Sequence, residues 1–268
     1  MAARGRSETI IVTTVTAGGA RREPDAVVVE EPMTIQLDGV VVATTMRTPG
    51  HDYELAAGFC FGDGLLAGFP VTGVRYCANG SAVDHHWNVV TVATGGLAPA
   101  PRPRVGNTTS SCGLCGNDAI EDLCTRLTAL PVTPLVAFDV LGRVPSTVLA
   151  DQRLFDATGA VHAAAVFTAA GEVLVLREDV GRHNAVDKVV GRLLLDGKLP
   201  ATGLGLFVSG RASFEMVQKA WAAGFSTLLS VSAPTALAVH TARRANMALA
   251  GFVSADRLNL YAPERLQP

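Results

Sequence analysis

Two cysteines separated by two residues, Cys112 and Cys115, are the strongest candidates for chemistry in this sequence. They lie in a glycine-rich run that follows a proline-rich stretch and precedes a short helical pattern. The thiolate is the reactive form of cysteine, and a nearby helix N-terminus or cation lowers the thiol pKa. Flanking glycines keep such thiols accessible, so the pattern predicts a reactive dithiol in a mobile loop.

Three uses of this spacing compete: half of a zinc site, a redox dithiol, and a persulfide carrier. Zinc would need two further ligands, and the sequence offers only Cys124 and scattered histidines. A thioredoxin-like motif would end a strand and open a helix within a βαβ unit, which this loop does not. Spacing alone does not separate redox chemistry from sulfur transfer. Cys60 and Cys77 are interpreted as packing residues.

Polar residues also follow three predicted strands, in the runs 178–184, 209–213 and 230–235. A fourth run, 254–257, follows the last predicted strand. Ligands of open α/β sheets bind beyond the carboxyl ends of the strands, where helix N-termini point inward. These loops are therefore the predicted ligand site.

Within these loops, Arg182 and Arg211 could clamp a phosphate, with Gly210 allowing close backbone approach. His183 is retained beside them as a candidate. Helix capping is the favoured alternative for three hydroxyl residues, Ser213, Ser232 and Thr235. The sequence has no phosphate-loop lysine motif and no Gly-x-Gly-x-x-Gly, which argues against an ordinary ATPase or a dinucleotide dehydrogenase.

The first half of the chain predicts a loose tail over 1–25 and a small α+β domain over 26–98. Asp38-Gly39 between alternating apolar residues indicates a hairpin. An amphipathic helix is expected over 51–66, with strands over 73–77 and 86–92. Residues 99–130 form the predicted linker with the mobile Cys-x-x-Cys loop.

Residues 131–268 alternate between strand and helix patterns, which predicts a parallel or mixed sheet with helices on both faces. The fold class is therefore α/β, with a three-layer C-terminal domain and a smaller α+β N-terminal domain. The expected helices are 147–156, 184–195, 214–223 and 235–247, and the expected strands are 163–168, 173–176, 205–208, 227–231 and 249–253.

Composition limits the possible functions. Hydrophobic residues make up 49% of the 268 residues, so a large core is expected. The formal net charge is −2, so the chain has no excess of positive charge that would attract nucleic acid or an anionic membrane. The apolar stretches are too short or too interrupted to span a bilayer. Five thinly spread cysteines fit a reducing compartment, so a cytoplasmic location is expected.

Several long runs of residues, taken together in their order along the chain, resemble a known family. The chain resembles the FdhD family of formate dehydrogenase accessory sulfurtransferases, and the match covers most of the chain from about Glu31 onward. The strings that carry it are Arg47-Thr48-Pro49-Gly50, Glu54 to Phe59, Ser111 to Gly116, Glu178 to Lys188, Ser209 to Lys219 and Val231 to Thr235.

The resemblance implies a homodimeric carrier that receives sulfur from a cysteine desulfurase and passes it to the molybdenum cofactor used by formate dehydrogenase. Cys112 would hold the persulfide and Cys115 would assist. The cofactor, bis(molybdopterin guanine dinucleotide), would be bound as substrate, and no permanently bound metal is expected. The implied binding residues, beyond Arg182, His183, Ser209 and Arg211 at the strand ends, are Phe252, Val253, Ser254, Ala255, Asp256 and Arg257.

The resemblance also implies a fold similar to cytidine deaminases. The deaminase zinc pattern of His-x-Glu with Pro-Cys-x-x-Cys is absent, so deamination is not implied. Two other functions stay open: a chaperone that binds the molybdenum cofactor without transferring sulfur, and a thiol-redox protein.

Overall fold

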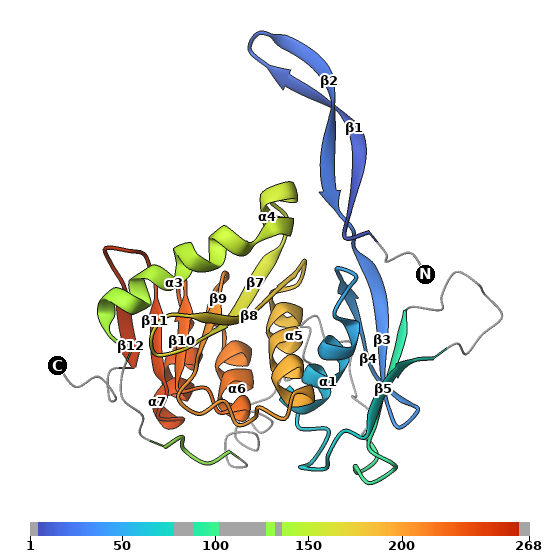
Figure 1. The fold of residues 1–268 in the computed structure, drawn as a ribbon, viewed down its shortest axis with the longest axis vertical. Helices are drawn as coiled ribbons and strands as arrows, with labels where there is room; N and C mark the ends of the chain where they lie inside the picture. The colour runs from blue at the N-terminus through green and yellow to red at the C-terminus, as the bar shows by residue number, and fades with distance from the viewer. Residues whose placement is uncertain (1–4, 78–87, 102–126, 132–135, 263–268) are drawn as a thin grey trace.

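The computed structural model describes residues 5–77, 88–101, 127–131 and 136–262. The chain begins with a hairpin of two long strands, β1 (Ser7–Thr16) and β2 (Gly19–Val28), which rises away from the rest of the molecule (Figure 1). The loose tail expected over 1–25 is therefore wrong for most of its length. Ile, Val and Thr dominate β1, and their branched side chains favour extended backbone even where polar residues obscure the apolar alternation.

A four-stranded sheet follows, in the order β4-β3-β6-β5. Its strands are β3 (Glu31–Leu37), β4 (Val40–Arg47), β5 (Gly73–Tyr76) and β6 (Val89–Ala93). Asp38 and Gly39 both have positive φ, 48° and 89°, which confirms the hairpin that this pair indicated. Helix α1 (Asp52–Gly62) packs Leu55 and Phe59 against the buried face of this sheet.

A six-stranded mixed sheet forms the second half, in the order β12-β11-β10-β9-β7-β8. Its strands β9, β10 and β11 are parallel, whereas β7, β8 and β12 run antiparallel to their neighbours. Separate hydrophobic clusters lie on its two faces, so helices cover both, as the sequence predicted. The strands are β7 (His162–Phe167), β8 (Val173–Asp179), β9 (Gly205–Val208), β10 (Thr227–Ser230), β11 (Ala248–Gly251) and β12 (Asn259–Ala262).

Three helices, α5 (Arg182–Leu195), α6 (Phe214–Ala223) and α7 (Ala236–Arg244), cover one face, and α3 (Phe138–Asp151) covers the other (Figure 1). The short helix α4 (Arg153–Thr158) follows α3. The single helix expected over 147–156 is thus two helices, and α3 begins nine residues earlier. It continues through Pro145 because Leu141, Val144 and Val148 form one buried stripe against the sheet.

The small sheet and the large sheet are joined by α1 and α5, whose backbones touch. A Cβ atom on Gly58 would lie 1.9 Å from the carbonyl oxygen of Asp187, and one on Gly191 would lie 1.8 Å from that of Glu54. No side chain larger than hydrogen fits at either position. Glycine at both positions therefore sets how closely the two helices approach.

Candidate functional site

A cavity of about 630 Å³ lies where the sequence predicted a ligand site, at the carboxyl edge of the parallel strands. It opens between the ends of β9, β10 and β11 on one side and α3 and α4 on the other. Four of the predicted site residues line it: Ser209, Val253, Ser254 and Ala255. The expectation that ligands bind beyond the carboxyl ends of the strands thus located a cavity, and residues 209 and 253–255 form one of its walls.

Most of the cavity wall is apolar, formed by Leu149, Phe155, Phe207 and Val231 among others. Its polar corner is built around Ser209, whose Oγ accepts a hydrogen bond from the amide of Ala163 at 2.8 Å. The same oxygen lies 3.5 Å from Nδ1 of His162. Apolar walls with a few fixed polar groups are typical of small-molecule sites.

Two of the cavity residues that sequence reasoning missed, His162 and Gln152, carry polar groups suited to a ligand. Burial first, then the nearby charges of Arg182 and His183, lowers the pKa of His162, so its imidazole is neutral at pH 7. Gln152 is only 5% exposed, yet its carboxamide forms no hydrogen bond to any residue that the structure describes. A buried amide is normally satisfied, so an amide that lines a cavity without a partner suits a polar ligand.

Arg182, at the start of α5, lies beside this polar corner. A Cβ on Gly210 would lie 3.5 Å from Cδ of Arg182 and 3.5 Å from Nδ1 of His162. The Nε of Arg182 is buried and has no hydrogen-bond partner in the described part of the chain. A guanidinium held there, at the N-terminus of α5, can receive an anionic group of a ligand.

The remaining predicted site residues lie apart from the cavity. His183 places Nε2 against a carboxylate oxygen of Glu215, so it is engaged within the protein. Arg211 is exposed and does not line the cavity. Phe252 is 45% exposed. Asp256 and Arg257 belong to an exposed turn that the amide of Ser254 closes on the carbonyl of Arg257 at 2.8 Å.

The capping interpretation holds for one of the three hydroxyl residues. Thr235 caps α7 by accepting a hydrogen bond from the amide of Ala238 at 3.2 Å. Ser213 occupies the N-cap position of α6 but makes no capping hydrogen bond, and its Oγ is buried without a partner among the described residues. The amide of Ser232 instead donates to Oγ of Ser230 at 3.1 Å.

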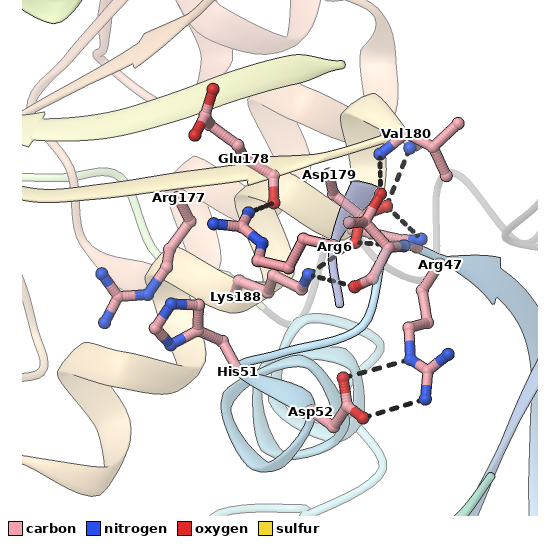
Figure 2. Close-up of polar contacts among 12 residues, drawn as sticks. Arg6, Arg47, His51, Asp52, Arg177, Glu178, Asp179, Val180 and Lys188 are labelled. Carbon is pink, nitrogen blue, oxygen red and sulfur yellow. Dashed lines mark hydrogen bonds and ion pairs between the residues drawn. The ribbon is translucent and has the colours of Figure 1, made fainter. Parts of the chain in front are cut away.

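The run 178–184 has a structural role that the sequence did not reveal. Lys188 and Asp179 are both fully buried and form an ion pair of 2.6 Å (Figure 2). Thr48 joins them from the small sheet, accepting from Nζ of Lys188 at 2.9 Å and donating its amide to Asp179 at 3.2 Å. Asn184 donates to Asp179 at 2.9 Å. Asp179, Asn184 and Lys188 therefore hold the two halves together rather than contacting a ligand.

Glu178 fixes the position of the cavity wall. Its two carboxylate oxygens accept hydrogen bonds from the amides of Leu154, at 3.1 Å, and Phe155, at 2.8 Å. These amides open α4, which has no side-chain cap of its own. The carboxylate therefore satisfies amides that the helix leaves unpaired.

The predicted catalytic residues Cys112 and Cys115 lie outside the described residues, as does Cys124. Of the described thiols, Cys60 is fully buried, and burial raises its pKa to about 12, so it is unreactive at neutral pH, in agreement with a packing role. Cys77 is partly buried, with its sulfur 2.8 Å from Oγ1 of Thr91.

The described residues contain no group of three or more His, Cys, Asp or Glu side chains suited to hold a metal ion. None of the described helices is long and apolar enough to cross a membrane.

A mixed sheet with helices on both faces and a cavity at the carboxyl edge of its parallel strands defines this chain as an α/β protein with a candidate small-molecule site. Residues 28–267 match the model of the FdhD/NarQ family. The chain belongs to this family.

Curated relatives cover nearly the whole chain. The sulfur carrier protein FdhD of Streptomyces avermitilis is 46% identical over 258 residues, which are 92% of this chain and 90% of the relative. The protein of the same name from Corynebacterium efficiens is 43% identical over 265 residues, 95% of each. A crystal structure from Desulfotalea psychrophila, assigned as a formate dehydrogenase accessory protein, matches with a TM-score of 0.76 at 25% identity, over 98% of this chain and all of that one.

Proposed function

We propose that this chain is a cytoplasmic sulfur carrier that receives sulfur from a cysteine desulfurase and passes it to the molybdenum cofactor destined for formate dehydrogenase. Its relatives named as sulfur carriers and its structural relative assigned to formate dehydrogenase support the overall role. The cavity at the strand ends carries the acceptor half of the proposal, because it is lined by the buried Gln152 amide, which has no hydrogen bond to any described residue.

In the first step, the thiolate of Cys112 attacks the terminal sulfur of the desulfurase persulfide. A new S–S bond forms to Cys112, the donor's S–S bond breaks, and the donor cysteine leaves as a thiolate that takes up a proton. No oxidant or reductant is needed, because the sulfane sulfur keeps its oxidation state. In the second step, the thiolate of Cys115 attacks Sγ of Cys112. The S–S bond to the outer sulfur breaks, a Cys112–Cys115 disulfide forms, and the outer sulfur leaves as sulfide for the cofactor, so the two thiols supply the two electrons.

The bis(molybdopterin guanine dinucleotide) cofactor is the substrate that accepts the sulfur. One of its flat heterocyclic ends fits the apolar cavity, with Gln152 and His162 as hydrogen-bonding groups at the ring edge. Arg182 lies beside the cavity and can receive a phosphate. His183, engaged with Glu215, orients this region rather than binding the ligand directly.

Sulfur loading tests the carrier half. We expect Cys112→Ala to accept no labelled sulfur from a cysteine desulfurase, whereas Cys77→Ala, the matched control, accepts as much as the unmodified chain. Mass spectrometry separates a one-sulfur adduct from a disulfide, which a thiol-redox protein would form instead. Full labelling of Cys112→Ala would remove this residue from the mechanism.

Nucleotide binding tests the acceptor half. Gln152→Leu keeps the side-chain size and removes the amide, so we expect roughly tenfold weaker binding of GDP by calorimetry, as for the loss of a buried hydrogen bond. Asp151→Asn, an exposed neighbour, is the control. We expect Arg182→Gln to weaken GDP more than guanosine, because only GDP carries phosphate; equal losses would contradict a phosphate contact.

The activity of the matured formate dehydrogenase distinguishes a sulfur carrier from a chaperone that only binds the cofactor. Formate dehydrogenase matured with a Cys112→Ala/Cys115→Ala double variant should lack activity if sulfur transfer is the function. A chaperone that only holds the cofactor would still yield active enzyme.

A further inference from the structure

The hairpin β1–β2 is fixed to the body at its root by one arginine, Arg6. The amide of Val29 donates to the carbonyl of Arg6 at 2.9 Å, which closes the base of the hairpin. The side chain of Arg6 runs beside Gly50, where a Cβ would lie 3.8 Å from Cδ of Arg6. Its guanidinium donates to the carbonyl of Glu178 at 3.2 Å (Figure 2). The root of the hairpin is therefore bonded to the end of β8.

Glu178 connects this root to the wall of the cavity. Its main-chain carbonyl accepts from Arg6, and its carboxylate accepts from the amides of Leu154 and Phe155 in the first turn of α4. Helix α4 also lies alongside β2. The same residue thus holds Arg6 through its backbone and α4 through its side chain.

The first turn of α4 carries groups that line the cavity. Phe155 forms part of the apolar wall, and Gln152, directly before α4, contributes the buried amide. The amide of Asp156 donates to the carbonyl of Gln152 at 2.9 Å, which ties Gln152 to the helix. A shift of this turn by about 1 Å would take the amide out of hydrogen-bonding distance of a ligand.

The stability of the fold does not by itself explain the position of Arg6. Its Nε is buried and has no hydrogen-bond partner among the residues that the structure describes. Burial lowers the pKa of Lys188, the ion pair with Asp179 opposes this shift, and the charge of Arg6 adds to it, so the two cations lie close enough to repel. A buried donor without a partner and a like charge nearby both cost free energy.

We propose that Arg6 is a positioning residue for the cavity, because it holds the main chain of Glu178 and thereby fixes the first turn of α4. Arg6 itself does not line the cavity. The inference rests on the proposed function, in which the cavity receives a nucleotide end of the cofactor. It adds that the N-terminal hairpin sets the affinity of that cavity. Arg6 precedes residue 28, where the match to the family model begins, so this contact lies outside the matched region.

Calorimetric titration with GDP tests the inference. We expect Arg6→Met to raise the dissociation constant of GDP about fivefold, within the range for residues that act on a site without contacting its ligand. Arg6→Lys keeps a charged donor at this position and should restore most of the affinity. Arg22→Met, at an exposed position of the same hairpin, is the control and should bind GDP as the unmodified chain does. Equal affinities of Arg6→Met and the unmodified chain would overturn the inference.

A second substitution tests the route through Glu178. Glu178→Ala removes the carboxylate that holds α4 but keeps the main-chain carbonyl, so the further change Arg6→Met should weaken GDP binding no more. Losses that multiply in the double variant would show that Arg6 acts by another route, against the inference.

Hydrogen exchange without nucleotide gives a readout that does not depend on the ligand. In Arg6→Met, the amides of Leu154 and Phe155 should exchange about tenfold faster, as for the loss of one hydrogen bond to a charged group, whereas the buried strand β9 keeps its protection. Equal loss of protection in both regions would mark a general loss of stability and overturn the positioning role. Failure of the unmodified chain to bind GDP would contradict the proposed function, and exchange at these two amides would then still decide the inference.

Discussion

At the residue scale, the ion pair between Lys188 and Asp179 is the most consequential contact outside the cavity. Both side chains have no exposed surface, so removal of one leaves the other charged and buried. We expect Lys188→Met to lower the free energy of unfolding by about 3–5 kcal/mol. Urea denaturation followed by circular dichroism measures this loss.

The exposed pair Arg143 and Asp139 on α3 is the matched control, with side chains 62% and 66% exposed. Arg143→Met should change stability by less than about 1 kcal/mol, because water screens an exposed ion pair. Similar losses for the two variants would show that burial does not set the strength of the Lys188 contact.

Glu54 gives the pH dependence of stability a defined sign. Burial opposes its ionisation, but hydrogen bonds from Arg177, at 2.5 and 2.8 Å, and from His51 outweigh burial and lower its pKa to about 2. The unfolded chain binds this proton near pH 4.5. The contribution of Glu54 is therefore complete above about pH 4.5 and is lost as the pH falls toward 2.

We expect Glu54→Gln to be less stable than the unmodified chain at pH 6, with the difference shrinking steadily between pH 4.5 and 2. Urea midpoints measured at intervals of pH provide the comparison. A difference that stays constant over this interval would contradict the lowered pKa.

At the element scale, the crossing of α1 and α5 depends on two residues without side chains. Gly58→Ala would place a methyl carbon 1.9 Å from a backbone oxygen, which the rigid helix α5 cannot avoid without moving. We expect a loss of stability at or above the upper end of the 1–3 kcal/mol range, about 3 kcal/mol, typical of overpacking. Thermal denaturation measures it.

Gly62→Ala, near the end of the same helix, is the control. Its new methyl would meet the Lys219 side chain at 3.2 Å, a tight contact but a longer one than the 1.9 Å backbone contact at Gly58. A smaller loss is expected. Equal losses at the two positions would show that the backbone contact is not what limits the approach of the helices.

The sequence predicted those turns and helices that are determined by a few neighbouring residues. Asp38-Gly39 gave the β3–β4 hairpin, and α6 begins and ends where its sequence pattern does, at Phe214 and Ala223. The hairpin β1–β2 escaped prediction because it lacks a buried face, so the sequences of its strands show no apolar alternation. The helix expected from Thr147 begins nine residues earlier, at Phe138, because tertiary packing of its buried stripe carries α3 through Pro145.

The site was predictable only on the side that follows the strands. Ser209 and residues 253–255 were found because the carboxyl edge of a parallel sheet is a general ligand site. Gln152 reaches the same cavity from the junction of α3 and α4, and His162 reaches it from the start of an antiparallel strand, where no rule of position applies. Conversely, Asp179 and Asn184 lie at and just beyond the end of β8, but they form hydrogen bonds with Thr48 and Met46 at the end of β4, which only the three-dimensional arrangement reveals.

At the scale of the whole molecule, the two sheets are held together by buried contacts. Lys219, on α6, lies 2.6 Å from Asp187 on α5 and 3.3 Å from Asp63 beyond α1. All three side chains are nearly fully buried. We expect one cooperative unfolding transition, with amides of β3 and β9 showing the same protection in hydrogen exchange.

Earlier loss of protection in β3 than in β9 would show that the small sheet opens separately. Differential scanning calorimetry supplies an independent check, because a two-state transition gives equal calorimetric and van't Hoff enthalpies.

The backbone contact between Gly58 and Gly191 also restricts motion. Helices that meet atom against atom have no side-chain layer through which to slide, so shear between the two halves is blocked. Any widening of the cavity to admit a bulky guest must then come from α3 and α4, which lie over the opposite face of the large sheet. Glu178, which accepts hydrogen bonds from the amides of Leu154 and Phe155, therefore limits how far the first turn of α4 can move away from the large sheet.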